Sequence, residues 1–281
     1  MKKVELFPGI QSSVLGFGCA SVMGARGPRE SYKALNLALD YGITHFDLAR
    51  SYGYGEAEIF VGKVLSRKRR DRIVISSKFG IKANGKARML KPFKPIIRKL
   101  KRIKPHKSKA ILNTSNSVNP FVTDKFHDRV EISGQNMVKS LESSLRALNT
   151  NYLDYFFVHE PIKTIERIDE VLETAEKLKQ KGLIRAIGLA FMQSQQNLHE
   201  KYIQEFDILQ FNNSPGIENY DTILQKRSKK SNVFFSPING GVSRLAPNEK
   251  LETLHKDFPK SVILCATFDE KHMKQNVNLF S

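Results

Sequence analysis

Apolar residues along the chain gather in short runs that alternate with longer amphipathic stretches. Short runs rich in β-branched and aromatic residues predict strands, whereas apolar residues three and four positions apart predict helices. We expect eight strands, at residues 14–19, 44–49, 73–78, 155–160, 184–190, 207–212, 233–238 and 262–267. Helical spacing recurs between them and in shorter stretches later, most clearly at residues 29–42, 56–70, 134–149 and 165–182.

Strands that alternate with helices pair in parallel through crossover connections. Eight such units in 281 residues predict an α/β fold of the closed kind, a (β/α)8 TIM barrel. A doubly wound open sheet is the alternative, but no glycine-rich phosphate-binding sequence opens a strand-to-helix turn. The stretches "VELF" and "QSSVLGFG" on either side of Pro8 and Gly9 predict an N-terminal β-hairpin that caps the bottom of the barrel.

We expect a single domain over residues 1–281, because neither a repeat nor an interdomain linker interrupts the pattern. One segment departs from it, a long basic insertion at about residues 79–131. It exceeds the usual length of a strand-to-helix connection and contains several prolines and the run "KPIIRKLKRIKPHKSK". It is either a functional loop or a partly disordered one, and "FKPIIRKLKRI" is compatible with a short amphipathic helix over the barrel mouth.

The formal net charge of +18 is concentrated in this insertion, which holds 14 Lys and Arg against 3 Asp and Glu. Strong positive charge attracts nucleic acids, anionic surfaces and acidic ligands. The run lacks the interleaved aromatic residues of a stacking platform and matches no DNA-reading motif. We therefore expect no nucleic-acid partner, and a salt-dependent mobility-shift assay would reveal one.

The two cysteines, Cys19 and Cys265, form neither a disulfide framework nor a metal-binding spacing, which favours a reducing compartment and no metal site. No apolar run has the length of a membrane span. The N-terminal "MKKVELFPGI" lacks the apolar stretch of a secretory signal. These features predict a cytoplasmic protein without a membrane partner.

Four side chains that can do chemistry follow the predicted strands. Asp47 ends the second strand, Tyr52 lies in the next loop, Lys78 ends the third strand and His159 ends the fourth. In a (β/α)8 barrel the carboxyl ends of all strands meet on one face, so these side chains would converge. Each alone has an ordinary explanation: a turn residue, a rim aromatic, a solvated charge and a core histidine.

The stretches "GFGCASVMG", "GITHFDLARSYGYGEAEIFVGKVL", "IVISSKFG" and "LDYFFVHEP" resemble the aldo-keto reductase family, in its bacterial-type form with a short C-terminus. The family's catalytic tetrad falls on Asp47, Tyr52, Lys78 and His159. The resemblance implies an NAD(P)H-dependent oxidoreductase that reduces an aldehyde or ketone to an alcohol, or the reverse. Its partner would be a small-molecule carbonyl or alcohol substrate, and no metal is needed.

The tetrad has a physical logic. A carbonyl that accepts a hydride develops negative charge on its oxygen and needs a proton donor, which would be Tyr52. A free tyrosine has a pKa of about 10, and a neighbouring ammonium favours the ionised form and makes the hydroxyl a better donor. Lys78 would supply that charge, Asp47 would hold Lys78, and His159 would orient the carbonyl.

The later strands carry the cofactor site that the resemblance implies, for NADPH or alternatively NADH. Gln210 matches the glutamine that binds the nicotinamide carboxamide, and Phe235 takes the stacking position that is usually a tyrosine. The loop after it would wrap the pyrophosphate through Ser236, Ile238 and Gly240. The segment "ATFDEKHMKQN" resembles the part that binds the adenosine phosphate, with contacts from Thr267, Lys271, His272 and Asn276.

Some positions depart from the family pattern. Ala190 and Phe191 replace a Ser-Asn pair that binds the carboxamide, which leaves open a second function: a cofactor-binding regulatory protein of reductase fold with little turnover. The chain stops at Ser281 without a long C-terminal tail, so we expect an open substrate pocket in a monomer or weak dimer. Its walls would come from the insertion and from Val22, Met23, Tyr54 and Glu160. A carboxylate at Glu160 would favour polar or cationic substrates.

Overall fold

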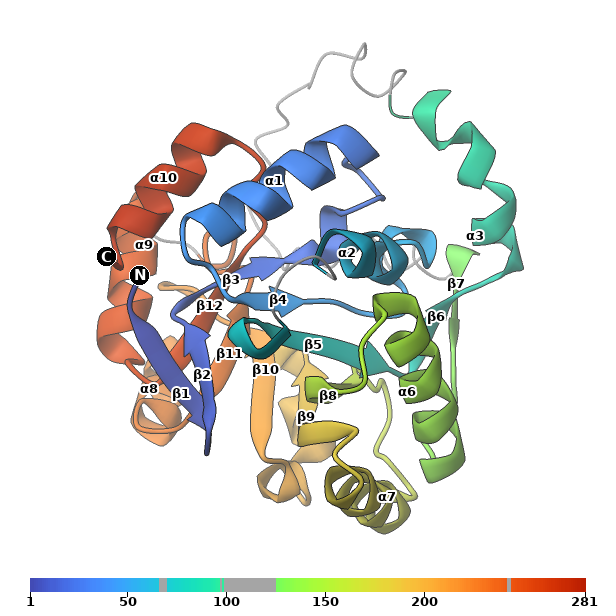
Figure 1. Ribbon diagram of the computed structural model, residues 1–281. Coiled ribbons are helices and arrows are strands. Elements are labelled where there is room, and N and C mark those ends of the chain that lie inside the picture. Colours follow the sequence, from blue (N-terminus) through green and yellow to red (C-terminus); the bar gives the residue numbers. More distant parts are fainter. Residues whose placement is uncertain (66–69, 97, 99–124, 242–243) are drawn as a thin grey trace.

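The computed structural model describes residues 1–65, 70–96, 98, 125–241 and 244–281. Within these ranges eight parallel strands close into a barrel, in which the last strand pairs with the first (Figure 1). The predicted (β/α)8 TIM barrel is therefore confirmed. In barrel order the strands are β3 (Leu15–Gly18), β4 (His45–Asp47), β5 (Val74–Phe79), β8 (Leu153–His159), β9 (Ile184–Phe191), β10 (Ile208–Asn212), β11 (Asn232–Phe235) and β12 (Ser261–Cys265).

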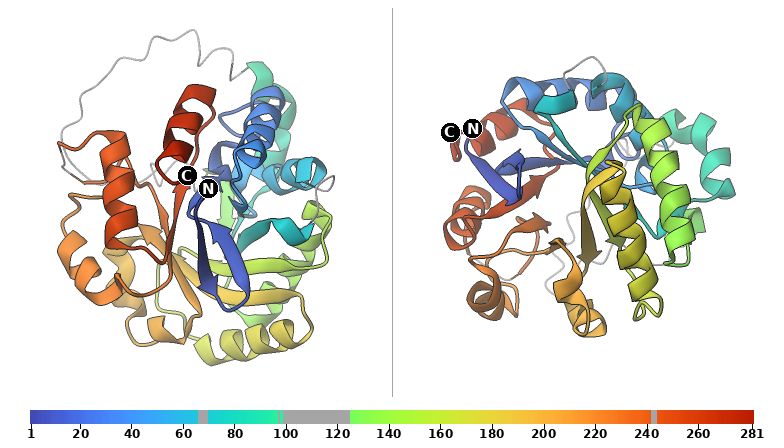
Figure 2. Two further views of the ribbon diagram at one scale, coloured as in Figure 1. Left: turned by 60° about the vertical axis from the view of Figure 1, so that its left-hand side comes forward. Right: turned by 60° about the horizontal axis from the view of Figure 1, so that its bottom comes forward.

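Helices surround the barrel on its outside (Figures 1 and 2). Most crossovers are α-helical, but the one between β9 and β10 consists of the 3-10 helices η5 (Gln193–His199) and η6 (Ile203–Glu205). Short 3-10 turns also occur at η1 (Cys19–Ser21), η2 (Tyr52–Tyr54) and η3 (Arg70–Arg72). The outer α-helices are α1 (Pro28–Asp40), α2 (Ala57–Leu65), α6 (Gly134–Leu148), α7 (Ile168–Gln180), α8 (Tyr220–Arg227), α9 (Pro247–Asp257) and α10 (Glu270–Asn278).

Helix α6 illustrates how the sequence sets these elements. The Ser133 hydroxyl caps the first turn by accepting a hydrogen bond from the Asn136 amide. Leu141 and Leu148 are buried against the barrel, as the helical spacing predicts. Asn149 then adopts a left-handed conformation with φ 52° and ends the helix.

The predicted N-terminal hairpin is also confirmed. Strands β1 (Lys3–Phe7) and β2 (Ile10–Ser13) pair antiparallel around Gly9, whose φ of 77° suits the turn. The hairpin joins the bottom of the barrel where β4 begins, because Ser13 and Thr44 exchange two hydrogen bonds of 2.9 Å between hydroxyls and backbone amides.

The insertion leaves the barrel after β5 and has structure of its own. Strands β6 (Ile81–Ala83) and β7 (His127–Arg129) form a separate antiparallel pair outside the barrel (Figure 1). Between them lie α3 (Gly85–Met89) and η4 (Lys91–Phe93). Residues 97 and 99–124, which include most of the predicted basic run, lie outside the described residues. The single-domain extent over residues 1–281 stays a prediction.

The strands form a continuous core, and β5 and β8 are buried along their whole length. Both cysteines are buried and free. None of the helices in the described ranges is long and apolar enough to cross a membrane.

Asp154 ties three strands together at the bottom of the barrel. Its carboxylate is 1% exposed and accepts hydrogen bonds from the Ile75 amide at 2.8 Å and from the guanidinium groups of Arg70 and Arg185 at 2.7 and 3.2 Å. Removing one partner of a buried ion pair leaves uncompensated charge, which costs more than the pair itself contributes.

We therefore expect Asp154→Ala to lower the free energy of unfolding by about 2–3 kcal/mol, below the upper range for buried pairs because both arginines are partly exposed. Urea denaturation measures this. Glu173→Ala is the matched control, since its pair with Lys177 lies on the exposed face of α7 and its loss should not move the midpoint. Equal midpoints for both variants would contradict the prediction.

Candidate active site

The barrel brings the predicted catalytic residues to one end. Asp47 is the last residue of β4, His159 is the last residue of β8, and Lys78 is the penultimate residue of β5. Since β4, β5 and β8 are parallel neighbours, these three side chains share the carboxyl end of the sheet. Tyr52 opens η2 in the loop that follows β4.

The Lys78 ammonium is the centre of the cluster. Its Nζ donates to Asp47 Oδ2 at 2.7 Å, to the Leu48 carbonyl oxygen at 2.7 Å and to the Tyr52 hydroxyl oxygen at 3.3 Å. Lys78 and Asp47 are 2% and 3% exposed. An ammonium buried to this degree needs a carboxylate and further acceptors, and this site supplies both.

Asp47 is itself fixed by two further donors. Its Oδ1 accepts hydrogen bonds from the Ser76 hydroxyl at 2.8 Å and from Gln210 Nε2 at 3.0 Å. Sequence reasoning missed Ser76, although it lies two positions before Lys78 and therefore points to the same face of β5. It placed Gln210 in the cofactor site but did not anticipate its contact with Asp47.

For both Tyr52 and Lys78, burial and the charge of a neighbouring residue shift the pKa in opposite directions. Burial raises the pKa of Tyr52 to about 12, and the nearby Lys78 opposes that rise. The expected lowering by Lys78 is thus present, but burial outweighs it. Burial also disfavours the charged form of Lys78, yet Asp47 and then Tyr52 outweigh it and raise the pKa of Lys78. The lysine is therefore a fixed cation and the tyrosine a neutral hydroxyl.

His159 completes the group. Its ring lies edge-on to the Tyr52 ring, with 6.1 Å between centroids. Burial, followed by the charges of Lys78 and Arg129, holds the pKa of His159 well below its usual range. The imidazole is therefore neutral and has one N–H to donate. Within the described residues its buried Nδ1 has no hydrogen-bond partner.

A second ion pair, between Arg50 and Glu58, fixes the segment before Tyr52 on the other side of β5. Glu58, 2% exposed, accepts from Arg50 Nη1 at 2.6 Å and from the Ser77 hydroxyl at 2.7 Å. Ser77 points to the opposite face of β5 from Lys78, so this pair joins α2 and the segment before Tyr52 to the outside of that strand. Its role was not visible in the sequence.

The predicted cofactor residues lie in or after β10, β11 and β12, which are parallel neighbours. Gln210 is 1% exposed, and its Oε1 is buried without a hydrogen-bond partner in the described chain. Ala190 lies beside both Gln210 and His159 in the sheet, and a methyl group offers no hydrogen bond. The Gln210 oxygen is therefore a buried acceptor that a ligand amide could satisfy.

The loop after β11 is held by a lysine that sequence reasoning did not identify. Lys250 on α9 donates from Nζ to the carbonyl oxygens of Ile238 and Gly240 at 2.9 and 3.1 Å. Phe235, at the end of β11, is partly buried, and Ser236 has a left-handed φ of 53°. The loop predicted to wrap a pyrophosphate thus has a defined conformation.

The last group of predicted contacts follows β12. Asn276 Nδ2 donates to Thr267 Oγ1 at 3.2 Å, which brings these two residues together. Lys271 and His272 are exposed in the first turn of α10, and the His272 amide is capped by Asp269. Both basic side chains are therefore accessible to an anionic ligand.

The predicted substrate-pocket residues share an unusual backbone. Met23, Tyr54 and Glu160 have left-handed φ values of 57°, 59° and 43° and lie in the loops after β3, β4 and β8. Such conformations are costly for residues other than glycine and cluster at functional sites. All three side chains are partly exposed, whereas Val22 is fully buried.

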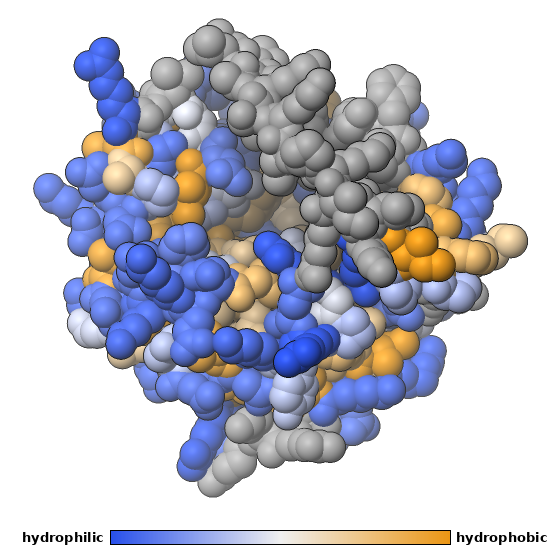
Figure 3. Space-filling view, turned by 90° about the horizontal axis from the view of Figure 1, so that it is seen from above, coloured by the Kyte–Doolittle hydropathy of each residue, from blue (hydrophilic) through white to orange (hydrophobic). Residues whose placement is uncertain are grey.

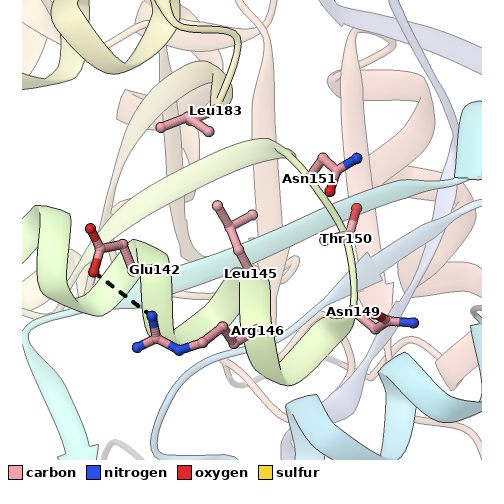
Figure 4. A pocket seen from close by; sticks show the side chains of 7 residues that line it. All are labelled: Glu142, Leu145, Arg146, Asn149, Thr150, Asn151 and Leu183. Carbon is pink, nitrogen blue, oxygen red and sulfur yellow. Dashed lines mark ion pairs between the residues drawn. The ribbon is translucent and has the colours of Figure 1, made fainter.

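The surface of the protein and a second pocket set this site in context. Seen from above, the described surface is mostly hydrophilic, with paler apolar side chains near the centre of the face (Figure 3). A separate pocket lies at the opposite end of the barrel, where α6 ends and β8 and β9 begin (Figure 4). It contains a Glu142–Arg146 ion pair of 3.8 Å but none of the predicted site residues.

Comparisons with known proteins identify related sequences and related folds. A family model described as "Aldo/keto reductase family" matches residues 14–233. D-threo-aldose 1-dehydrogenase from a Pseudomonas species is 28% identical over 193 residues, which cover 66% of this chain and 52% of that protein. An aldo-keto reductase from Bacillus halodurans, solved in its holo form, matches with a TM-score of 0.71 at 22% identity and covers 99% of this chain and 90% of its own.

A solved aldo-keto reductase from Klebsiella pneumoniae in complex with NADPH matches with a TM-score of 0.67 at 19% identity, over 100% of this chain and 90% of that chain. Likeness at these identities reports the fold. The chain spans about half the length of the curated relative that it matches. The family model, however, covers most of the chain, from residue 14, just before β3, to the start of β11. The chain therefore belongs to the aldo/keto reductase family.

Proposed function

We propose that this protein is an NAD(P)H-dependent oxidoreductase that reduces an aldehyde or ketone to an alcohol, or catalyses the reverse, with Tyr52 as the general acid. The observation that carries the proposal is the position of Lys78 Nζ, 2.7 Å from Asp47 Oδ2 and 3.3 Å from the Tyr52 hydroxyl. A neutral phenol beside a fixed cation is suited to giving up a proton and to stabilising the tyrosinate that remains.

The proposed mechanism gives each residue of the cluster one role. A bound nicotinamide supplies the hydride that the carbonyl carbon accepts. Tyr52 donates its hydroxyl proton to the carbonyl oxygen as negative charge develops there, and Lys78 stabilises the resulting tyrosinate. Neutral His159 donates a hydrogen bond to the same oxygen and orients it. Asp47 keeps the Lys78 ammonium in place.

The residues present fit a nicotinamide nucleotide. The unpartnered Gln210 Oε1 would accept a hydrogen bond from the carboxamide, and the Phe235 ring would stack on the nicotinamide. Ser236, Ile238 and Gly240 would line the pyrophosphate, and Thr267 and Asn276 the adenosine. We propose NADPH as the preferred nucleotide, since Lys271 offers a cation and His272 a hydrogen-bond donor to a 2′-phosphate, and NADH as the alternative.

Calorimetric titration with NADPH and with NADH, followed by a panel of aldehydes and ketones, tests the proposal. The chain lacks tryptophan, which makes heat a better signal than fluorescence quenching. We expect NADPH to bind with a dissociation constant in the micromolar range, and at least one carbonyl to be reduced. The absence of binding by either nucleotide would contradict the proposal. Binding without turnover would support the regulatory protein instead.

One lysine variant and its control test whether Lys271 distinguishes NADPH from NADH. Lys271→Ala should weaken NADPH binding about tenfold, the order expected for one lost hydrogen bond to a charged group, and leave NADH binding unchanged. Lys256→Ala, an exposed lysine on α9, is the matched control. Equal losses for both nucleotides in Lys271→Ala would show that this lysine does not contact the 2′-phosphate.

A further inference from the structure

In the loop that carries Tyr52, Tyr54 has a backbone conformation that is costly for residues other than glycine. Gly53 and Tyr54 both have left-handed φ values, 60° and 59°. A Cβ on Gly53 would lie 2.5 Å from the Val22 carbonyl oxygen, so the loop packs directly against the one that follows β3. Costly backbone conformations persist only when surrounding contacts determine them.

The insertion supplies contacts of this kind from one side. Lys94, just after η4, donates from Nζ to the Gly53 carbonyl oxygen at 2.7 Å, to the Met23 carbonyl oxygen at 3.3 Å and to Glu56 Oε2 at 2.5 Å. Its side chain is 7% exposed. This one ammonium therefore joins the loop after β3 to the loop after β4.

Arg98 also joins the insertion to the loop after β3. Its Nε donates to the Gly24 carbonyl oxygen at 2.9 Å, and its Nη2 donates to the Met23 carbonyl oxygen at 2.7 Å. Lys94 and Arg98 thus direct two cations at backbone carbonyls of the barrel mouth. In a solvated basic run these side chains would point into water rather than donate to backbone carbonyl oxygens.

The returning arm of the insertion holds the loop from the other side. The His127 ring stacks on the Tyr54 ring at 6.2 Å and 14°, and His127 Nε2 lies 3.1 Å from the Ser51 carbonyl oxygen. Phe126 meets the same tyrosine edge-on at 5.8 Å, and Lys94 Nζ lies 4.7 Å from its ring centroid. Tyr54 is therefore fixed by both arms, which β6 and β7 join at their base.

We propose that Lys94 is a positioning residue for Tyr52. By holding Gly53, Met23 and Glu56 it keeps the Tyr52 hydroxyl within reach of Lys78, so the insertion helps to build the reaction site. The catalytic half of this inference rests on the proposed function. The structural half, restraint of the loop at residues 52–56, does not.

The test compares Lys94→Met with Lys94→Arg, which restores a cation, and with Lys86→Met, an exposed lysine on α3. In Lys94→Met we expect kcat to fall about 10- to 100-fold, because small displacements of a catalytic group are costly, while KM for NADPH changes less than about twofold. Lys94→Arg should recover part of the loss, and Lys86→Met should match the unaltered protein. Glu56→Gln, which removes the charge partner, should act in the same direction with a smaller effect.

Two readouts distinguish positioning from a general structural defect. Hydrogen exchange on the full chain should be faster at the Gly55 and Glu56 amides, which donate to the Tyr52 and Gly53 carbonyl oxygens, in Lys94→Met alone. In a Tyr52→Phe background, Lys94→Met should reduce kcat little further.

Faster exchange with unchanged kcat, lower kcat with unchanged exchange, or an equal loss in the Tyr52→Phe background would each overturn the catalytic assignment. If the unaltered protein reduces no carbonyl, the proposed function fails, and hydrogen exchange alone decides the structural half. Unchanged exchange would then overturn it, and faster exchange would support it.

Discussion

Tyr52→Phe should reduce the turnover of a carbonyl substrate by about 10²–10⁴-fold, the range for loss of a positioned general acid. Phenylalanine keeps the ring that meets His159 at 6.1 Å but removes the only proton that the proposed mechanism transfers. Because the residues assigned to the nucleotide lie in or after β10, β11 and β12, NADPH affinity should change less than about twofold. Steady-state kinetics and calorimetry measure the two quantities.

Tyr32→Phe provides the matched control, since it deletes the hydroxyl of an exposed tyrosine on the outer helix α1. Tyr32 belongs to none of the predicted sites, so turnover should change little. Turnover by Tyr52→Phe equal to that of the unaltered protein would show that another group or a water molecule supplies the proton.

The sequence was sufficient to predict the barrel and to assign several candidate catalytic residues to one face of it. Alternating strand and helix patterns predict parallel strands, and parallel strands place their carboxyl ends together. Asp47, Lys78 and His159 could therefore be assigned to one face without any knowledge of distances. The N-terminal hairpin was equally accessible, because Pro8 and Gly9 mark its turn.

Contacts that depend on closure of the barrel were beyond sequence reasoning. Gln210 reaches Asp47 although β10 is not a neighbour of β4, which requires the whole barrel to be in place. The net direction of the Tyr52 pKa shift also could not be predicted, since the charge of Lys78 is legible in the sequence but the extent of burial is not.

The structure of the insertion could not be predicted from the sequence for a different reason. Its strands β6 and β7 have three residues each, too few for periodicity to reveal. Lys94 stands among many basic residues that look alike in the sequence, and only tertiary structure shows that it is buried against Gly53 and Glu56. A basic run is usually solvated, but within the described residues Lys94 is buried against the loop that carries Tyr52.

Lys78→Met should produce a loss comparable to that of Tyr52→Phe, because Lys78 acts through the tyrosine's proton. Without the ammonium, the Tyr52 tyrosinate loses its stabilising charge and stays close to the Asp47 carboxylate, whose charge already raises the pKa of Tyr52. The pKa of Tyr52 should therefore rise further. Alcohol oxidation, which needs Tyr52 to accept a proton, should then require a higher pH to reach the same rate.

A folding defect must be separated from this chemical effect. Lys78→Met leaves the Asp47 carboxylate buried with only neutral donors, Ser76 and Gln210, and unpaired buried charge destabilises a fold. The double variant Lys78→Met/Asp47→Asn removes both charges, so it should unfold at a higher urea concentration than Lys78→Met and yet remain inactive. Lys82→Met, an exposed lysine on β6, should be unaffected in both respects.

Non-additivity gives the sharpest test of the coupling between these two residues. If Lys78 serves only to stabilise ionised Tyr52, then Tyr52→Phe/Lys78→Met should be no slower than the slower single variant, since residues that act as a unit lose their function together. Rates of carbonyl reduction for the four proteins complete the cycle. A double variant whose loss equals the product of the two single losses would show that Lys78 acts on the substrate or the nucleotide directly, and the 3.3 Å contact with the Tyr52 hydroxyl would then be structural.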